Sequence, residues 1–395
     1  MHQHRRRNYL IRLGMALASL ALSLLMLTSS AFADESLEEG FAPLCNGHDL
    51  EGWVAMHGGD FEVRDEMIVC TGRSNWPSWL RTAEQYENFI LRLEYKTYYG
   101  AESGIYFSAP QAGRVADIGF EYQINGTGQL TPYSTGAIAG ASAPLARANN
   151  GSSDQEFQQL EIKLDWPKLE VRLNGQLVQD VNCEEHPLLK YKQRVGHLGF
   201  ACRGKRVDFR HVRIKRLPNQ VTDEWKPMFN GVDLSGWTIS DKCSATWEVD
   251  EQGVLTSADG HGYLVSDEEF YNCEWKCFIQ PTLLANGGVF FDWVPDNGRG
   301  FEIQIEDILD SNDPTGSIYG RVRASQLPRK QGEWSLLHVV LQDNTCIVRV
   351  DGTTVAESSS MNRRRWGRIS LQMHRNQETI QWKDMMIRQL PSPAK

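Results

Sequence analysis

A short segment that occurs twice is the strongest constraint on how this chain can fold. Gly-Phe-Glu-Tyr-Gln-Ile at 119–124 returns as Gly-Phe-Glu-Ile-Gln-Ile at 300–305. On a β-strand, successive side chains point to opposite faces. The aromatic and aliphatic residues of each segment would then face a core, while the glutamate and glutamine lie on the other face. The repeat indicates an internal duplication, and each copy is expected to present a carboxylate and an amide where a polar ligand could bind.

Other motifs repeat in the same order. Asn-Gly-His-Asp-Leu-Glu-Gly-Trp at 46–53 matches Asn-Gly-Val-Asp-Leu-Ser-Gly-Trp at 230–237, and Thr135-Gly136 matches Thr315-Gly316. A chain of 395 residues is long enough for two or three domains. We therefore predict a first domain over 39–217, a polar linker over 218–226 and a second domain over 227–391. These two domains are called the first copy and the second copy.

Within each copy the hydrophobic period is two residues. Leu160, Ile162 and Leu164 alternate with charged residues, and Asn174-Gly175 and Asp351-Gly352 follow similar runs. Asn-Gly and Asp-Gly favour the type I′ turns of β-hairpins, which need a positive φ at both central residues. Beyond the N-terminal segment there is no long pattern of helical period. Many short alternating strands with such turns predict an all-β sandwich or barrel.

The N-terminal segment 1–33 is predicted to be a signal peptide. Three consecutive arginines from Arg5 precede an apolar run at 13–27, and Ala-Phe-Ala at 31–33 provides a small-residue cleavage site. We expect export to a bacterial periplasm or cell exterior, by the general or the twin-arginine route. The apolar run is short for a membrane span of about 20 residues, although an uncleaved anchor is the alternative. We expect no span in the mature chain.

Charge and cysteine content narrow the possible partners. The formal net charge of −9, with no basic stripe after the N-terminus, argues against a nucleic-acid partner.

The eight cysteines of an exported chain could form disulfides, but their spacing fits no metal or disulfide framework. Because Phe229 and Met373 stand in the second copy where the first has Cys45 and Cys202, we interpret both cysteines as small buried apolar residues.

The ordered set of motifs resembles the 3-keto-disaccharide hydrolase domain family in both copies. The resemblance implies a concanavalin A-like jelly roll, and exported proteins that process glycans already oxidised at carbon 3. The fold we predict is therefore all-β, with two tandem jelly-roll sandwiches after the signal peptide. The family's closing Leu-Gln-x-His survives at 371–374 but reads Phe-Ala-Cys-Arg at 200–203. The second copy is thus the better candidate for activity.

Spacing bears on which chemistry the second copy could perform. Glu302 and Glu306 lie four residues apart on one strand face, about 13 Å. Ordinary glycosidases hold their two carboxyls about 5–9.5 Å apart. A 3-keto sugar needs only one base, because the ketone acidifies the hydrogen on carbon 2. On family positions, the predicted catalytic residues are Glu302 and His374, with Glu121 as the counterpart of Glu302 in the first copy.

Further residues are assigned by the same resemblance. The residues predicted to bind substrate are Gln304, Gln123, Asn286, Ser103 and Arg203. Asp307 could orient His374 or hold a divalent cation, since hard cations prefer carboxylate oxygens. The structural alternatives are that Glu121 and Glu302 only hydrogen-bond neighbouring strands, and that the acidic run at 306–313 is a solvated loop.

Three functional hypotheses follow. The first is a hydrolase or lyase that cleaves 3-keto glycosides by elimination and hydration. The second is a carbohydrate-binding protein with two degenerate sites, which the altered residues of the first copy favour. The third is a cell-surface structural module without a small ligand. In the first two, the expected partner is a carbohydrate. Retention of Glu302, Gln304, Asp307 and His374 favours the first hypothesis for the second copy.

Overall fold

The computed structural model describes residues 37–392, apart from 59, 74–77, 99, 126–129, 147–154, 220–224, 295–298, 309, 328–329, 364–365 and 375. The predicted signal peptide lies outside the described residues, as does most of the predicted linker. Among the residues described, no helix combines the length and the apolar character needed to cross a bilayer.

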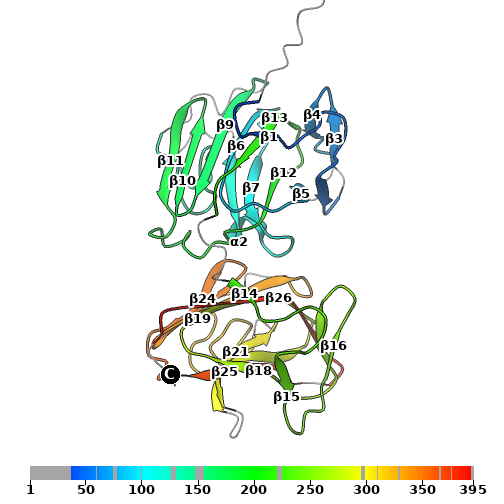
Figure 1. Cartoon of the computed structure of the whole chain (residues 1–395), viewed down its shortest axis with the longest axis vertical. Coiled ribbons are helices and arrows are strands. Elements are labelled where there is room, and N and C mark those ends of the chain that lie inside the picture. The colour runs from blue at the N-terminus through cyan, green and yellow to red at the C-terminus, as the bar shows by residue number, and fades with distance from the viewer. Residues whose placement is uncertain are drawn as a thin grey trace, which may run out of the picture. The chain divides into compact units, whose positions relative to one another are not determined.

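The first copy is a sandwich of two antiparallel sheets (Figure 1). The longer sheet has the order β11 (Gln176–Asn182), β10 (Lys168–Leu173), β9 (Gln158–Asp165), β6 (Phe89–Thr97), β13 (Val207–Arg216), β4 (Met67–Cys70) and β3 (Phe61–Arg64). The shorter sheet has the order β2 (Trp53–Met56), β5 (Ser78–Thr82), β12 (His197–Cys202), β7 (Ser103–Ala109) and β8 (Phe120–Ile124). A two-residue strand, β1 (Ala42–Pro43), and a short helix, α2 (Val115–Ile118), complete the copy.

The second copy repeats this plan. Its longer sheet has the order β16 (Thr246–Val249), β17 (Leu255–Ala258), β26 (Thr379–Gln389), β19 (Cys273–Pro281), β22 (Ser335–Gln342), β23 (Thr345–Val350) and β24 (Thr353–Ser358), and β14 (Trp225–Pro227) also pairs with β26. The shorter sheet has the order β15 (Trp237–Ile239), β18 (Gly262–Phe270), β25 (Gly367–Met373), β20 (Asn286–Val294) and β21 (Arg299–Glu306). The predicted fold of two tandem all-β jelly rolls is confirmed.

Alternation builds both cores as expected. Leu160, Ile162 and Leu164 of β9 are at most 3% exposed and face the opposing sheet, as does the matching set on each neighbouring strand. The hairpin turns after β10 and β23 take a positive φ at both central residues, 50° and 77° at Asn174-Gly175 and 45° and 77° at Asp351-Gly352. The sequence prediction of these hairpins is confirmed.

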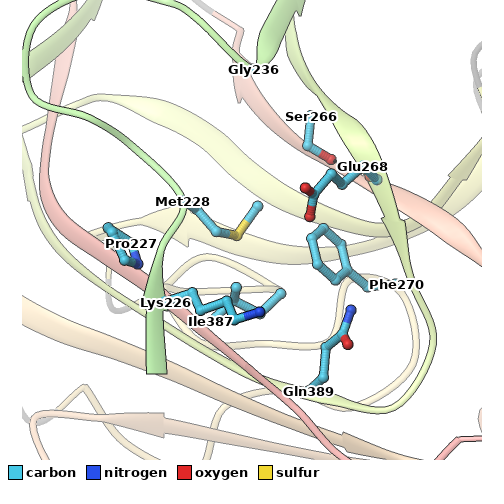
Figure 2. Close-up of a pocket in the computed structure, with 9 residues that line it drawn as sticks. All are labelled: Lys226, Pro227, Met228, Gly236, Ser266, Glu268, Phe270, Ile387 and Gln389. Atoms are coloured by element: carbon cyan, nitrogen blue, oxygen red, sulfur yellow. Dashed lines mark hydrogen bonds between the residues drawn. The ribbon is translucent and has the colours of Figure 1, made fainter. Parts of the chain in front are cut away.

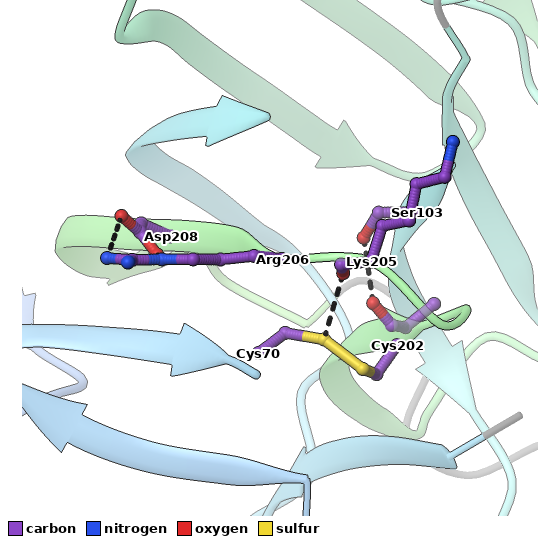
Figure 3. Close-up of a disulfide and its surroundings, with 7 residues drawn as sticks. Cys70, Ser103, Cys202, Lys205, Arg206 and Asp208 are labelled. Carbon is purple, nitrogen blue, oxygen red and sulfur yellow. Dashed lines mark hydrogen bonds and ion pairs between the residues drawn. A yellow bond between two sulfur atoms is a disulfide. The ribbon is translucent and has the colours of Figure 1, made fainter. Parts of the chain in front are cut away.

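One cross-link corrects the interpretation of Cys202 as a free apolar residue. Cys202 of β12 forms a disulfide with Cys70 of β4, so the bond joins the two sheets of the first sandwich (Figure 3). The second sandwich has no cysteine pair there, and the Ser257 hydroxyl lies 3.8 Å from the Met373 sulfur instead. Cys45 is a free cysteine and is half-buried. The disulfide closes a separation of 132 residues, which no local cysteine spacing reveals.

Candidate active site

The repeated glutamate lies on the outer face of the shorter sheet in each copy. In β21, Phe301, Ile303 and Ile305 are buried in the core, and Glu302 and Gln304 project from the opposite side. Strand register places Glu302 opposite Phe290, and Gln304 opposite Gly288. The same face continues across β25 and β18. This surface, called the Glu302 face, comprises Glu302, Gln304, Gly288, Phe290, Ser370, Gln372 and Tyr263.

Aromatic rings form the inner part of the Glu302 face. The Tyr263 ring centroid lies 5.6 Å from that of Phe290 and 4.5 Å from that of Trp293, and Phe290 and Trp293 are 5.3 Å apart. Gln372 donates a hydrogen bond to the Tyr263 hydroxyl at 3.2 Å. A half-buried patch of rings with amide groups at its edge suits the apolar faces and hydroxyl groups of a sugar.

A glycine makes room for the carboxylate in both copies. A Cβ atom added at Gly288 would lie 2.4 Å from Glu302 Oε1, and one added at Gly104 would lie 2.1 Å from Glu121 Oε1. Each glutamate side chain therefore lies across the glycine of the neighbouring strand. Only glycine permits this close approach, which explains why both copies carry glycine at this strand position.

The Glu302 carboxyl is poised to exchange a proton near neutrality. Burial raises its pKa to about 7, and the negative charge of Asp313 adds to that effect. Among the described residues, none forms a hydrogen bond or ion pair with this carboxylate. Partial burial without a compensating cation is costly for a carboxylate, and such groups are concentrated at functional sites. A carboxyl with this pKa can act as a general base at neutral pH.

Glu121 lies in a different environment. Its side chain is 2% exposed, and Arg203 Nη2 lies 2.5 Å from Glu121 Oε1. Burial raises the pKa of Glu121, and the Arg203 guanidinium counteracts that shift. Burial alone would lower the pKa of Arg203, but the Glu121 charge outweighs it and the pKa of Arg203 is raised. The two groups are thus held as an ion pair, and the carboxylate is not free to act as a base.

The partner of Glu121 occupies the motif position of His374. Arg203 directly follows β12 and His374 directly follows β25, the matching strand. The His374 N–H donates to the Asn286 carbonyl at 3.0 Å, and its side chain is exposed. Arg203 reaches the carboxylate of its own copy. Because His374 occupies the equivalent position in the second copy, it lies on the same side of Glu302, but its side chain is shorter. Among the described residues, His374 and Glu302 form neither a hydrogen bond nor an ion pair with each other, so the catalytic role of His374 stays a prediction.

Sequence comparison decides the family. The profile of the 3-keto-alpha-glucoside-1,2-lyase-like domain matches residues 40–215 and again 224–388. The chain belongs to this family. The predicted resemblance is thereby confirmed for both copies, and by this assignment the protein is carbohydrate-active and hydrolase-like in kind.

Several solved structures are similar to the single copies. A proposed glycosyl hydrolase from Parabacteroides distasonis is 22% identical, with a TM-score of 0.41, and the match covers 48% of this chain and 99% of that chain. A carbohydrate-binding module, CBM66, from Bacillus subtilis is 14% identical, with a TM-score of 0.30 and coverage of 41% and 94%. A β-glucanase from Bacillus licheniformis is 13% identical, with a TM-score of 0.33 and coverage of 44% and 100%. No curated protein matches the chain.

Two residues of the first copy that were predicted to bind substrate have partners within the protein. The Ser103 side chain is fully buried, and its hydroxyl donates to the Ala201 carbonyl at 2.7 Å (Figure 3). The Arg203 guanidinium is paired with Glu121 and is 31% exposed, so its role in binding substrate stays a prediction. Gln123 is 4% exposed, which leaves little of its amide for a ligand. The first copy therefore presents few of the polar groups predicted from its sequence.

Two predicted binding residues of the second copy lie on the strand pair β20–β21 and differ in exposure. Gln304 is on the Glu302 face but only 3% exposed. Asn286 is half-buried, and its amide donates to Glu306 Oε1 at 2.9 Å. Glu306 is thus held by the same strand pair and also accepts a hydrogen bond from Ser311. The roles of Gln304 and Asn286 in binding substrate stay predictions.

The cation predicted at Asp307 gains no support from its surroundings. Asp307 is buried, and its Oδ1 accepts a hydrogen bond from the Thr315 hydroxyl at 2.6 Å. Over the described part of the chain, no group of three or more His, Cys, Asp or Glu side chains could hold a metal ion. The hydrogen bond to Thr315 gives Asp307 a structural role in fixing the loop after β21.

Tyr319 is a residue of this surface that the sequence reasoning missed. Ile303 and Ile318 form a β-bridge, and the Tyr319 N–H donates to the Glu302 carbonyl at 2.9 Å. Tyr319 therefore lies directly opposite Glu302, on the outer edge of the sheet, and its side chain is 55% exposed. The repeated Thr-Gly-x-Ile motif ends one residue before it, but only the register of the bridge places Tyr319 opposite Glu302.

A separate cavity of about 380 Å³ opens elsewhere on the second sandwich (Figure 2). It is lined by Lys226, Pro227, Met228, Gly236, Ser266, Glu268, Phe270, Ile387 and Gln389. None of these residues belongs to the Glu302 face. The cavity therefore lies apart from the candidate active site, and the sequence reasoning assigned no function to the residues that line it.

Proposed function

We propose that the second copy cleaves 3-keto glycosides, with Glu302 as the general base. The observation that carries the proposal is the state of this carboxyl, which has a pKa of about 7 and no cationic partner among the described residues. It projects from a surface that also presents aromatic rings. Membership of the 3-keto-alpha-glucoside-1,2-lyase-like family supports the choice of substrate class.

In the proposed reaction, the carbon-3 ketone acidifies the hydrogen on carbon 2, and the Glu302 carboxylate removes it as a proton. The electron pair left behind forms an enolate. The enolate then expels the oxygen at carbon 1, which leaves with the bonding pair and takes up a proton. Addition of water across the resulting double bond returns a free 3-keto sugar. His374 is proposed to protonate the leaving oxygen, because its position lies on the same side of the carboxylate as Arg203 in the first copy.

The contacts of Glu306 argue against a conventional two-carboxylate glycosidase at this site. Glu306 lies about 13 Å along the strand from Glu302 and is hydrogen-bonded to Asn286 and Ser311. A retaining or inverting mechanism needs its second carboxyl within about 9.5 Å. One-base elimination at an activated carbon requires no such partner, so it fits the single available carboxyl.

For the first copy we propose carbohydrate binding without catalysis. The specific observation is the Arg203–Glu121 pair, which neutralises the only glutamate of the repeated motif. Trp79 and Tyr106 lie on the same sheet with ring centroids 5.5 Å apart. Trp79 is buried and Tyr106 is half-buried, so Tyr106 is the ring of this pair that a ligand could reach.

We also propose that the protein is exported. The N-terminal sequence pattern is the first support, and the Cys70–Cys202 disulfide is the second. Disulfides form and persist in oxidising compartments and are rare in the reducing cytosol.

The test is release of para-nitrophenol from para-nitrophenyl 3-keto-glucoside by the chain that begins at Asp34. Loss of the base should lower kcat/KM of Glu302→Gln by roughly 10²- to 10⁴-fold. Glu121→Gln is the matched control, because it changes the same motif position in the first copy, and its activity should stay near that of the unmodified chain. Undiminished turnover by Glu302→Gln would refute the assignment of the base. Absence of turnover by the unmodified chain would refute the proposed activity.

A further inference from the structure

Tyr319 is held in place by its own turn rather than by packing of its ring. Its N–H is bonded to the Glu302 carbonyl, and Ile318 exchanges backbone hydrogen bonds with Val322, which closes a tight turn around Tyr319 and Gly320. Gly320 takes a φ of 62°, which favours glycine. The backbone is therefore fixed beside the carboxylate while the side chain remains 55% exposed.

Tyr319 lies on the outer side of Glu302, and Phe290 lies on the inner side. Register places the backbones of both residues opposite Glu302, and Tyr319 is the first residue of the turn that follows the bridge at Ile318. Directly opposed residues on neighbouring strands have Cβ atoms about 4.5–5.5 Å apart. A sugar ring brought to the carboxylate would thus pass within reach of an exposed phenol ring.

The first copy lacks this ring. Its bridge between Tyr122 and Ile138, together with the hydrogen bond from Ala139 N–H to the Glu121 carbonyl, places Ala139 opposite Glu121. An exposed tyrosine does occur in the corresponding loop, Tyr133, which is 63% exposed, but it lies six residues before Ala139. Tyr106 lies opposite Glu121 on the inner side, as Phe290 does for Glu302, so the two copies differ at the outer position, where the first has Ala139 and the second has Tyr319.

We infer that Tyr319 is a substrate-positioning residue whose ring stacks on the apolar face of the glycoside bound at Glu302. This inference rests on the proposed function for the site, and it adds the contact that holds the sugar. An exposed, backbone-anchored ring loses little conformational entropy when it stacks, and the CH groups of a pyranose supply a flat apolar surface. The phenol hydroxyl is not needed for such a contact.

The experiment separates binding from chemistry. With para-nitrophenyl 3-keto-glucoside, Tyr319→Ala should raise KM by about fivefold to tenfold, the range expected for loss of one aromatic contact, with kcat within about threefold. Tyr319→Phe should keep the KM of the unmodified chain, because it keeps the ring. Tyr133→Ala is the matched control and should change neither constant. A fall in kcat with an unchanged KM would overturn the inference.

A second measurement keeps the inference independent of turnover. The same compound is titrated calorimetrically into Glu302→Gln and into Glu302→Gln/Tyr319→Ala. The second variant should bind about fivefold to tenfold more weakly, and equal affinity would overturn the stacking role. If the unmodified chain binds the compound but does not cleave it, the proposed activity fails while the stacking role is still decided by these two affinities.

Discussion

The two copies share a strand order, a glutamate and the glycine beneath it, but only the glutamate of the first copy has a cationic partner among the described residues. In the first copy Arg203 pairs with Glu121, which is almost fully buried. In the second copy His374 stands at the position of Arg203, and Glu302 is left with a pKa of about 7. The residue after the matching strand, Arg203 in the first copy and His374 in the second, therefore distinguishes an ion-paired glutamate from a candidate base.

The comparison shows that the two copies keep one fold while the charge compensation at the repeated glutamate differs. A buried carboxylate without a partner destabilises a protein, and a guanidinium within hydrogen-bonding distance offsets much of that cost. The first copy has this compensation and also carries the Cys70–Cys202 cross-link. The second copy has neither at the corresponding positions, and an uncompensated group of this kind is what a catalytic base requires.

The disulfide should give the largest difference in stability between the copies. Removing it with Cys70→Ser/Cys202→Ser should lower the free energy of unfolding of the first sandwich by about 2–4 kcal/mol, because the reduced chain gains entropy when unfolded. The second sandwich should be unaffected. Hydrogen exchange in increasing guanidinium chloride, measured separately for β4 and β17, reports the two sandwiches individually.

A free cysteine provides the control for this measurement. Cys45→Ser should retain the stability of the unmodified chain and its sensitivity to dithiothreitol, since Cys45 is not in the bond. Equal loss of protection in β4 and β17, or no loss in β4, would contradict the assignment of the cross-link.

Breaking the ion pair should have a smaller effect. Arg203→Ala leaves Glu121 buried without a partner, and we expect a loss of about 2 kcal/mol, below the usual range for buried pairs because Glu121 can take up a proton. Arg203 is also 31% exposed, which weakens the pair further. The loss should grow as pH rises, because the proton that relieves the buried charge becomes harder to hold. Thermal unfolding at pH 5 and pH 8 measures this.

The matched change in the second copy is His374→Ala. Its side chain is exposed, so the free energy of unfolding should change by no more than about 0.5 kcal/mol. Glu121→Gln/Arg203→Ala should recover most of the stability lost by Arg203→Ala. If Arg203→Ala and His374→Ala have equal effects on stability, the contrast drawn between the two copies is wrong.

Local patterns were sufficient to predict much of this molecule. Alternation in segments such as 160–164, the hairpin at Asn174-Gly175 and the duplicated motif indicated the strands, the turns and the two jelly rolls. They also placed Glu302 and Gln304 on one face. All of these depend on residues close together in sequence, for which side-chain periodicity is a direct physical signal.

The missed features depend on contacts between distant segments. The Cys70–Cys202 bond, the Arg203–Glu121 pair and the position of Tyr319 opposite Glu302 each require knowledge of which strands are neighbours and in which register. The burial of Ser103 has the same cause, because its local sequence does not reveal which face of β7 it occupies. Strand order, register and burial decide these features, and none of the three can be read from composition.

The most direct test of the account is the titration of Glu302, followed by carbon NMR of the side-chain carboxyl and assigned with Glu302→Gln. Burial raises its pKa to about 7, above the value of about 4.3 for an unfolded glutamate. The folded chain therefore binds this proton more tightly. The resulting contribution to the free energy of unfolding is fully present below about pH 4 and is lost as pH rises through 7. The carboxylate, which is the active base form, appears as the pH rises through 7. The account predicts a midpoint near 7 that His374→Ala leaves unchanged, and a midpoint near 4 would contradict it.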